Sequence, residues 1–183
     1  VEGVVTGFAS VCVNGIELHY QSDTHVTIHG KPGSPRDLAV GQVVRAQAAG
    51  SGEEMRALSL QIRHLMVGRL QSAQAGRLQA MGQNIVLAEG AKLPESIAAG
   101  QKVAVSGFAG PNGAIYATRI DAASPTAPDS LAGPVSRDAH GQISIGGVRI
   151  EGAAHDLRPG DNARAEGRFD NGGFQAERIE RDT

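Results

Sequence analysis

Chemistry in this sequence could come from one thiol and three imidazoles near its start. Cys12 is the only cysteine, and His19, His25 and His29 follow it closely. Thiolate and imidazole together suit copper or zinc, so these four residues are a candidate metal site. If residues 25–29 form a strand, His25 and His29 share a face but lie roughly 13 Å apart, too far for one ion without a turn or partner strand between them. The alternative is that the histidines lie on the surface and Cys12 packs on a hairpin strand. We therefore expect no resident cofactor, with copper or zinc as the alternative.

Motifs that would mark an enzyme are missing from the sequence. It contains no Gly-x-Ser-x-Gly elbow, no His-Glu-x-x-His and no phosphate-binding glycine loop followed by lysine. Glycine pairs such as 146–147 and 172–173 fall where hairpin turns are expected. We expect a non-catalytic protein with no catalytic and no cofactor-binding residues.

The composition is that of a folded chain with small cores. The 183 residues are 40% hydrophobic and 20% charged, as in ordinary globular domains. Glycine is frequent, with 25 residues, whereas aromatic residues make up only 3% and tryptophan is absent. Short strands joined by tight turns suit this composition. Any core must be built from Val, Ile, Leu and Ala.

Charge and cysteine content exclude several classes of protein. The net charge is −2 with basic and acidic residues interspersed, so we do not expect nucleic acid to be the main partner. A lone cysteine excludes an internal disulfide framework. No apolar stretch approaches the ~20 residues of a membrane-spanning helix. The chain begins at Val1 rather than Met, so we expect that any signal peptide has been removed.

Three landmarks recur in the same order along the chain. The first is an opening strand with glycine, the second a turn ending in glycine, and the third a closing Ala-x-x-Ile/Leu strand. Their positions, at near-constant spacing, are Gly3, Gly68 and Gly133; then Gly41, Gly100 and Gly160; then Ala57–Leu60, Ala117–Ile120 and Ala176–Ile179. The chain is therefore predicted to hold three copies of one structural unit.

Each copy is predicted to contain about five short strands. Hairpin turns are expected at 14–15, 81–82 and 146–147, and again at 50–52, 112–113 and 171–172. A single helical turn is expected at 34–38, where serine precedes proline, and in the same place at 93–97. This pattern suits a small closed barrel. We predict an all-β protein of three tandem small OB-like β-barrels with short helical turns.

The predicted domains are residues 1–63, 64–122 and 131–183, with a linker at 123–130. The linker is rich in Pro, Ser and Ala, so we expect it to be exposed and the third repeat to be the more mobile one. The pattern of apolar residues continues through residues 61–67, which contain no proline. The first two barrels are therefore expected to be rigidly joined or to share a continuous strand.

Residues 3–15 read Gly-Val-Val-Thr-Gly-Phe-Ala-Ser-Val-Cys-Val-Asn-Gly, and a matching pattern continues through Leu38, Gly41, Val44 and the Ala57–Leu60 signature. This resembles a family of exported bacterial domains of unknown function, often found in tandem. Copies two and three lack the Gly-Phe and Val-Asn-Gly elements, and Ala9 stands where glycine is common. The resemblance implies a small OB-like barrel on a secreted, periplasmic or lipid-anchored bacterial protein, and it supplies no catalytic residues.

The function expected from these observations is a non-catalytic binding or scaffold protein of the bacterial cell envelope, with a protein partner. Serial barrels can bridge partners or space them from a membrane, held there by a lipid attached ahead of Val1. The alternatives are a periplasmic copper- or zinc-binding protein that uses Cys12 and the nearby histidines, and a glycan- or nucleic-acid-binding OB module.

Overall fold

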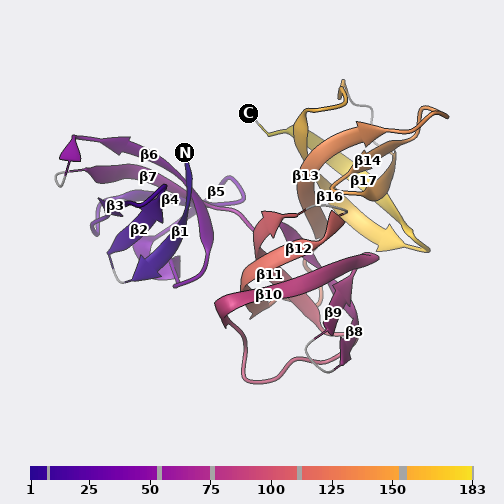
Figure 1. The fold of residues 1–183 in the computed structure, drawn as a ribbon, viewed down its shortest axis with the longest axis horizontal. Helices are drawn as coiled ribbons and strands as arrows, with labels where there is room; N and C mark the ends of the chain where they lie inside the picture. Colours follow the sequence, from indigo (N-terminus) through magenta and orange to yellow (C-terminus); the bar gives the residue numbers. More distant parts are fainter. Residues whose placement is uncertain (8, 53–54, 75–76, 111–112, 153–155, 183) are drawn as a thin grey trace. The chain divides into compact units, whose positions relative to one another are not determined.

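A computed structural model describes residues 1–183 except 8, 53–54, 75–76, 111–112, 153–155 and 183. The chain is built almost entirely of β-strands and divides into two compact units, Val1–Arg63 and His64–Thr183 (Figure 1). This confirms the all-β class. No helix in the described part of the chain is long and apolar enough to cross a membrane.

The first unit is one closed barrel. Its sheet has the order β3-β2-β1-β6-β7-β4-β5, and a further pairing of β3 with β7 closes it. The strands are β1 (Glu2–Gly7), β2 (Ser10–Val13), β3 (Ile16–His19), β4 (His25–Ile28), β5 (Lys31–Gly33), β6 (Val43–Ala49) and β7 (Arg56–Ile62).

The second unit holds two closed barrels in one ten-stranded sheet. Its order is β11-β12-β10-β9-β8-β13-β14-β15-β17-β16, and the pairings β11–β8 and β13–β16 close the two barrels. The second repeat comprises β8 (Met66–Gln74), β9 (Arg77–Ala80), β10 (Gln83–Lys92), β11 (Lys102–Ala109) and β12 (Ile115–Ala122). The third comprises β13 (Asp129–Arg137), β14 (Ile143–Ile145), β15 (Val148–Gly152), β16 (Asn162–Asp170) and β17 (Gly173–Arg181).

The Ala-x-x-Ile/Leu signature marks a β-bulge in all three repeats. A regular strand cannot turn residues i and i+3 to the same face, because its side chains alternate. In each closing hairpin the register shifts at this point, between Gln47/Ala48, Ser106/Gly107 and Glu166/Gly167. One residue is skipped (Leu58, Thr118 or Glu177), so Ala57 and Leu60, and likewise Ala117 and Ile120, are both buried.

The predicted hairpin turns lie where the sequence indicated. Asn14 and Gly15 adopt φ angles of 51° and 79° between β2 and β3, the geometry that favours Asn-Gly. Turns at 81–82, 146–147 and 171–172 have the same positive φ pattern. The predicted turns at 50–52 and 112–113 involve or adjoin residues outside those described. Ala9 has a φ of 68°, which explains why glycine is common at this position of the resembled family.

The second landmark is the same capped turn in each repeat. Its glycine N–H donates to the opening strand: Gly41 to Val5 O, Gly100 to Leu70 O and Gly160 to Val135 O. The side chain one residue later then accepts a backbone N–H across the turn. These acceptors are Gln42, Gln101 and Asp161, at 2.8, 3.2 and 2.9 Å. The repeated Leu/Ile-to-Gly pattern therefore specifies how the opening strand meets the strand after the turn, which is β6, β11 or β16.

The expected helical turn forms in the first repeat but not in the second. Ser34 caps a 3₁₀ turn at Pro35–Asp37, and its N–H donates to Asp37 Oδ2 at 2.8 Å. The expectation at 93–97 is wrong, since these residues form no helical turn. Leu93 stands where Ser34 stands in the first repeat, and its side chain cannot accept the hydrogen bond that starts the turn.

The cores follow the division into units. Eleven buried residues around Leu18, Leu60 and Ile62 fill the first barrel. The second and third repeats instead share one continuous cluster that runs from Met66 through Leu131 to Phe174. The third repeat is joined to the second by a strand ladder and a common core, so it is not a separate body on a free linker. The linker is also shorter than expected, because Asp129 and Ser130 already belong to β13.

Replacing Ser34 with alanine should destabilise the first unit by about 1 kcal/mol, since the cap of the 3₁₀ turn is lost. Cys12, the lone cysteine, lies in β2 of this unit, so its reaction with a thiol reagent in increasing denaturant measures the unfolding of the unit. Ser124→Ala, in the second unit, is the control and should leave the Cys12 transition in place. Equal transitions for wild type and Ser34→Ala would contradict the role of the cap.

Candidate binding groove at the junction of the second and third repeats

The structure brings two of the four predicted metal ligands onto one face. Cys12 is half-buried on β2, directly opposite Glu17 of β3, and His19 is paired with Ser10. Cys12 and His19 therefore occupy diagonal positions on the outer face of this hairpin, where side chains lie within reach of one another.

The other two ligands lie apart from this pair. His25 begins β4 beside Ser59 of β7, whereas His29 lies in the turn after β4, with a φ of 49°. The strand ends at Ile28, so His25 and His29 do not share one strand face. No three His, Cys, Asp or Glu side chains among the described residues are grouped closely enough to hold a metal ion. Metal binding at Cys12, His19, His25 and His29 stays a prediction.

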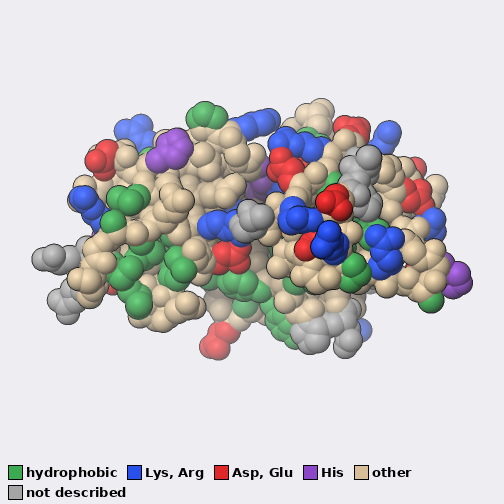
Figure 2. All heavy atoms as spheres, turned by 90° about the horizontal axis from the view of Figure 1, so that it is seen from above, with side chains coloured by type: hydrophobic (Ala, Val, Ile, Leu, Met, Phe, Trp, Pro, Cys, Tyr) green, Lys and Arg blue, Asp and Glu red, His purple; other side chains and the backbone are tan. Residues whose placement is uncertain are grey.

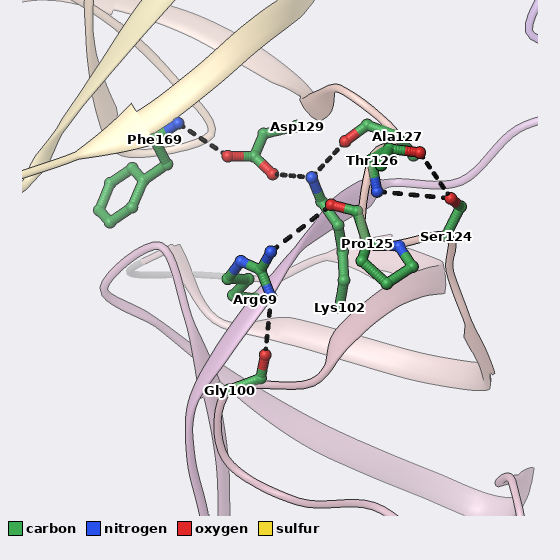
Figure 3. Close-up of polar contacts among 9 residues, drawn as sticks. All are labelled: Arg69, Gly100, Lys102, Ser124, Pro125, Thr126, Ala127, Asp129 and Phe169. Atoms are coloured by element: carbon green, nitrogen blue, oxygen red, sulfur yellow. Dashed lines mark hydrogen bonds and ion pairs between the residues drawn. The ribbon is translucent and has the colours of Figure 1, made fainter.

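A different polar cluster forms where β8, β11 and β13 meet. The register pairs Lys102 of β11 with Arg69 of β8, and Ser130 of β13 with Val67 of β8. Three strands from two repeats thus place Arg69, Lys102 and Asp129 near the connector 123–128 (Figure 3).

A buried ion pair lies at the centre of this cluster. Lys102 Nζ is 2.8 Å from Asp129 Oδ1, and the two side chains are only 7% and 12% exposed. Lys102 Nζ also donates to the carbonyl of Ala127, and Asp129 Oδ2 accepts the N–H of Phe169 at 2.9 Å. Buried charges need such partners, because an uncompensated one costs several kcal/mol.

Arg69 holds the connector from the other side. Its guanidinium donates to Gly100 O at 3.0 Å and reaches Pro125 O at 3.5 Å (Figure 3). The N–H of Ala123 donates to Lys102 O, and the hydroxyls of Ser124 and Thr126 lie 3.0 Å apart. The connector is therefore bound to the second repeat along its length and does not act as a free linker.

Beside this cluster the surface forms a groove of about 470 Å³. Its walls combine both signs of charge with one aromatic ring and amide groups. They comprise Arg69, Gln71, Met81, Lys102, 125–129, Gly167, Arg168, Phe169 and Glu177. Lys102 and Asp129 neutralise each other, so Arg69, Arg168 and Glu177 are the charges of the wall that remain for a ligand. This arrangement suits a polar segment that carries both charges.

On the face shown in Figure 2, basic and acidic side chains are interspersed, with no large area of one sign. This agrees with the small net charge of the chain. A long phosphodiester backbone would require a continuous basic track.

Among the described residues, His64 has a clear change in its pKa. Burial is the main cause and lowers the pKa below its ordinary value of 6.5; Arg164 and Arg119 act in the same direction and Asp121 opposes them. Arg119 forms a bidentate pair with Asp121, and Arg164 donates to the backbone carbonyl of His64 at 2.6 Å. His64 therefore lies neutral in a charged setting at the start of the second unit.

Sequence comparison supplies the family. A sequence family described as "Domain of unknown function (DUF5666)" matches residues 1–60 and 67–121, more than half of the chain. The chain belongs to this family. No curated protein and no solved structure matches it. The DUF5666 match covers the first two repeats, whereas the third has the same strand arrangement without matching the family.

The groove was not predicted from the sequence. Lys102 and Asp129 each begin a strand, and their separation along the chain forms no recognisable motif. The one available signal is that Lys102 occupies the position of Val43 and Asn162 in the other repeats. A charged residue at a position that is neutral in both other copies indicates a local role.

Replacing Lys102 with methionine should destabilise the second unit by about 3–5 kcal/mol, because Asp129 is left buried without its partner. The double variant with Asp129→Leu should regain much of this loss. Denaturant unfolding followed by circular dichroism measures both. Arg149→Met is the control, since Arg149 and Glu151 form an exposed pair worth less than about 1 kcal/mol. Similar losses for Lys102→Met and Arg149→Met would contradict the role of the ion pair.

His64 should make stability depend on pH. Its folded pKa lies below the unfolded value, so the unfolded chain takes up the proton first as the pH falls through about 6.5. The free energy of unfolding should therefore fall more steeply for wild type than for His64→Gln between pH 7.5 and 5. His140→Gln, at an exposed histidine, should follow wild type. Parallel curves for wild type and His64→Gln would rule out this effect.

Proposed function

We propose that this protein is a non-catalytic binding or scaffold protein of the bacterial cell envelope. In this proposal the second and third repeats act as one rigid platform, and its groove holds a polar segment of a protein partner. The observation that carries the proposal is the joining of two barrels by one continuous sheet and by the bound connector. A spacer or scaffold needs such rigidity, because a mobile joint would cost conformational entropy on binding.

The OB-like assignment belongs to this proposal and is supported by strand order. Numbering the strands of the second repeat 1 to 5 from β8, the closed order is 1-2-3-5-4-1, with strands 3 and 5 parallel. The third repeat has the same order and the same parallel pair, β15 with β17. In the first repeat β3 and β4 share the role of strand 3, and both pair parallel with β7. OB folds are five-stranded Greek-key barrels that use outer strand faces and loops for binding.

The envelope location is supported by the resemblance of residues 3–15 to exported bacterial domains. An extracellular or periplasmic role, with or without a lipid anchor, suits a chain whose single cysteine needs no disulfide partner. A protein partner is supported by the mixed charges of Arg168 and Glu177, which favour a polypeptide segment over a uniformly charged polymer.

A photocrosslinking amino acid in place of Arg168 tests the groove directly. In bacterial cells that carry the protein in their envelope, it should give one discrete crosslinked species, and Glu177→Lys in the same chain should abolish it. The control position is Arg137, exposed at the other end of β13 from Asp129. No adduct from position 168, or the same adducts from both positions, would refute the groove as a partner site.

A further inference from the structure

A row of exposed apolar side chains crosses three neighbouring strands of the second repeat. Val86 of β10 pairs with Tyr116 of β12, and Tyr116 pairs with Phe108 of β11. Residues paired in this way point to the same face of the sheet. All three side chains lie on the outside of the barrel, 43%, 43% and 41% exposed. Large apolar side chains gathered on an outer face need an explanation, whereas scattered ones do not.

The other two repeats show that the fold does not require this row. The corresponding paired positions hold His19, Arg56 and Ala49 in the first repeat. In the third repeat they hold Glu151, Gln175 and Arg168, and Gln175 donates to Glu151 at 2.7 Å. Since the same barrel forms with polar residues or alanine at these positions, the barrel does not require the large apolar side chains of this row, which belong to the second repeat.

The Tyr116 ring lies close to the backbone of Gly110. A Cβ added at Gly110 would lie 2.7 Å from Tyr116 Cδ2, so any side chain there would displace the ring. The N–H of Gly110 donates to Ala114 O at 2.7 Å and holds the end of the β11–β12 hairpin. The Cδ2–Cε2 edge of the ring thereby lies close to Gly110, which limits the orientations of the ring. When the ring is already held in one orientation, stacking of a flat ligand on it costs little side-chain conformational entropy.

Uncharged amides border the row. Asn84 lies two residues before Val86 on the same face of β10, and it is paired with Gln79 of β9. No hydrogen bond within the described residues engages either side-chain amide. The Tyr116 hydroxyl adds another donor and acceptor. The site therefore offers a flat apolar surface with neutral hydrogen-bonding groups beside it.

The size and charge of the site determine the ligand class. At these exposed fractions the three side chains present roughly 250 Å² of surface, well below the ~800 Å² per partner of a stable protein interface. Arg77 is a cation on the same face of β9, but one guanidinium is not the basic groove that a phosphodiester needs. We propose that this row binds a neutral oligosaccharide, whose sugar ring stacks on Tyr116 and Phe108 while Asn84 and Gln79 hydrogen-bond its hydroxyls.

This inference goes beyond the proposed function. The row shares no residue with the groove that contains Arg168 and Glu177. Saccharide binding and partner crosslinking can therefore be lost independently. A negative result for the saccharide site does not contradict the partner groove, and the reverse also holds.

The test titrates the intact chain with cellotetraose, maltotetraose, mannotetraose and the N-acetylglucosamine tetramer. Tryptophan is absent, and Tyr20 is buried in the first unit, so NMR signals of Tyr116 and Phe108 and tyrosine fluorescence report on the site. At least one saccharide should shift these signals saturably. Tyr116→Ala should then weaken binding roughly tenfold or more, the scale of stacking on one aromatic ring.

Two further variants separate the site from a general loss of folding. Gly110→Ala keeps Tyr116 but displaces its ring, and should also weaken binding. Leu93→Ala removes an equally exposed apolar side chain of the same repeat and should bind as wild type. The proposal is overturned if no saccharide moves the Tyr116 signals, or if Tyr116→Ala binds as well as wild type. It is also overturned if only a single-stranded oligonucleotide binds, with an affinity that falls steeply as salt rises.

Discussion

The pairing of β8 with β13 is the constraint on which the second unit depends. Closure of the second barrel leaves half of one edge of β8 without a partner: β9 covers Leu70–Gln74, and the beginning of the strand is open on that side. An open edge exposes backbone donors and acceptors and invites association with other chains. β13 fills this half-edge, with Leu131 opposite Met66. These two residues are equivalent in the repeat, so the two opening strands meet as a local two-fold pair.

This pairing decides the character of the connector. Once β13 is paired with β8, residues 123–128 must pass the first residue of β11, Lys102, on the way from β12 to β13. Their carbonyls would be left without hydrogen bonds unless donors lay beneath them. Arg69 and Lys102 supply those donors, and Asp129 compensates the buried lysine. A sequence rich in Pro, Ser and Ala can therefore be well ordered when strand pairing places hydrogen-bond partners along it.

Three copies of one barrel carry three different outer surfaces. The row that runs from strand 3 through strand 5 to strand 4 combines His19 and Arg56 with Ala49 in the first repeat. It is apolar in the second repeat, and in the third it is polar, with Glu151, Gln175 and Arg168. The inward positions change less in character, because they are filled mostly by Val, Ile, Leu, Ala and Met, with Tyr20 and Phe174 as buried aromatic residues. The barrel is thus a constant support, and function lies in the outward residues. Tandem repetition allows one chain to present several unlike surfaces.

The sequence by itself determined the features that local physics controls. Asn-Gly pairs fix the positive φ angles of the hairpins, Ser34 before Pro35 starts the 3₁₀ turn, and alternating Val, Ile and Ala define the strands. Only the tertiary structure decided which strand edges meet, and hence that the third repeat joins the second. It also decided that Phe108 and Tyr116 lie exposed in one row while Tyr20 and Phe174 are buried. Lys102 and Asp129 could not be paired from their spacing, because the distance between two side chains at strand starts depends on register. Register follows from the burial of the whole sheet, which no single segment of the chain encodes.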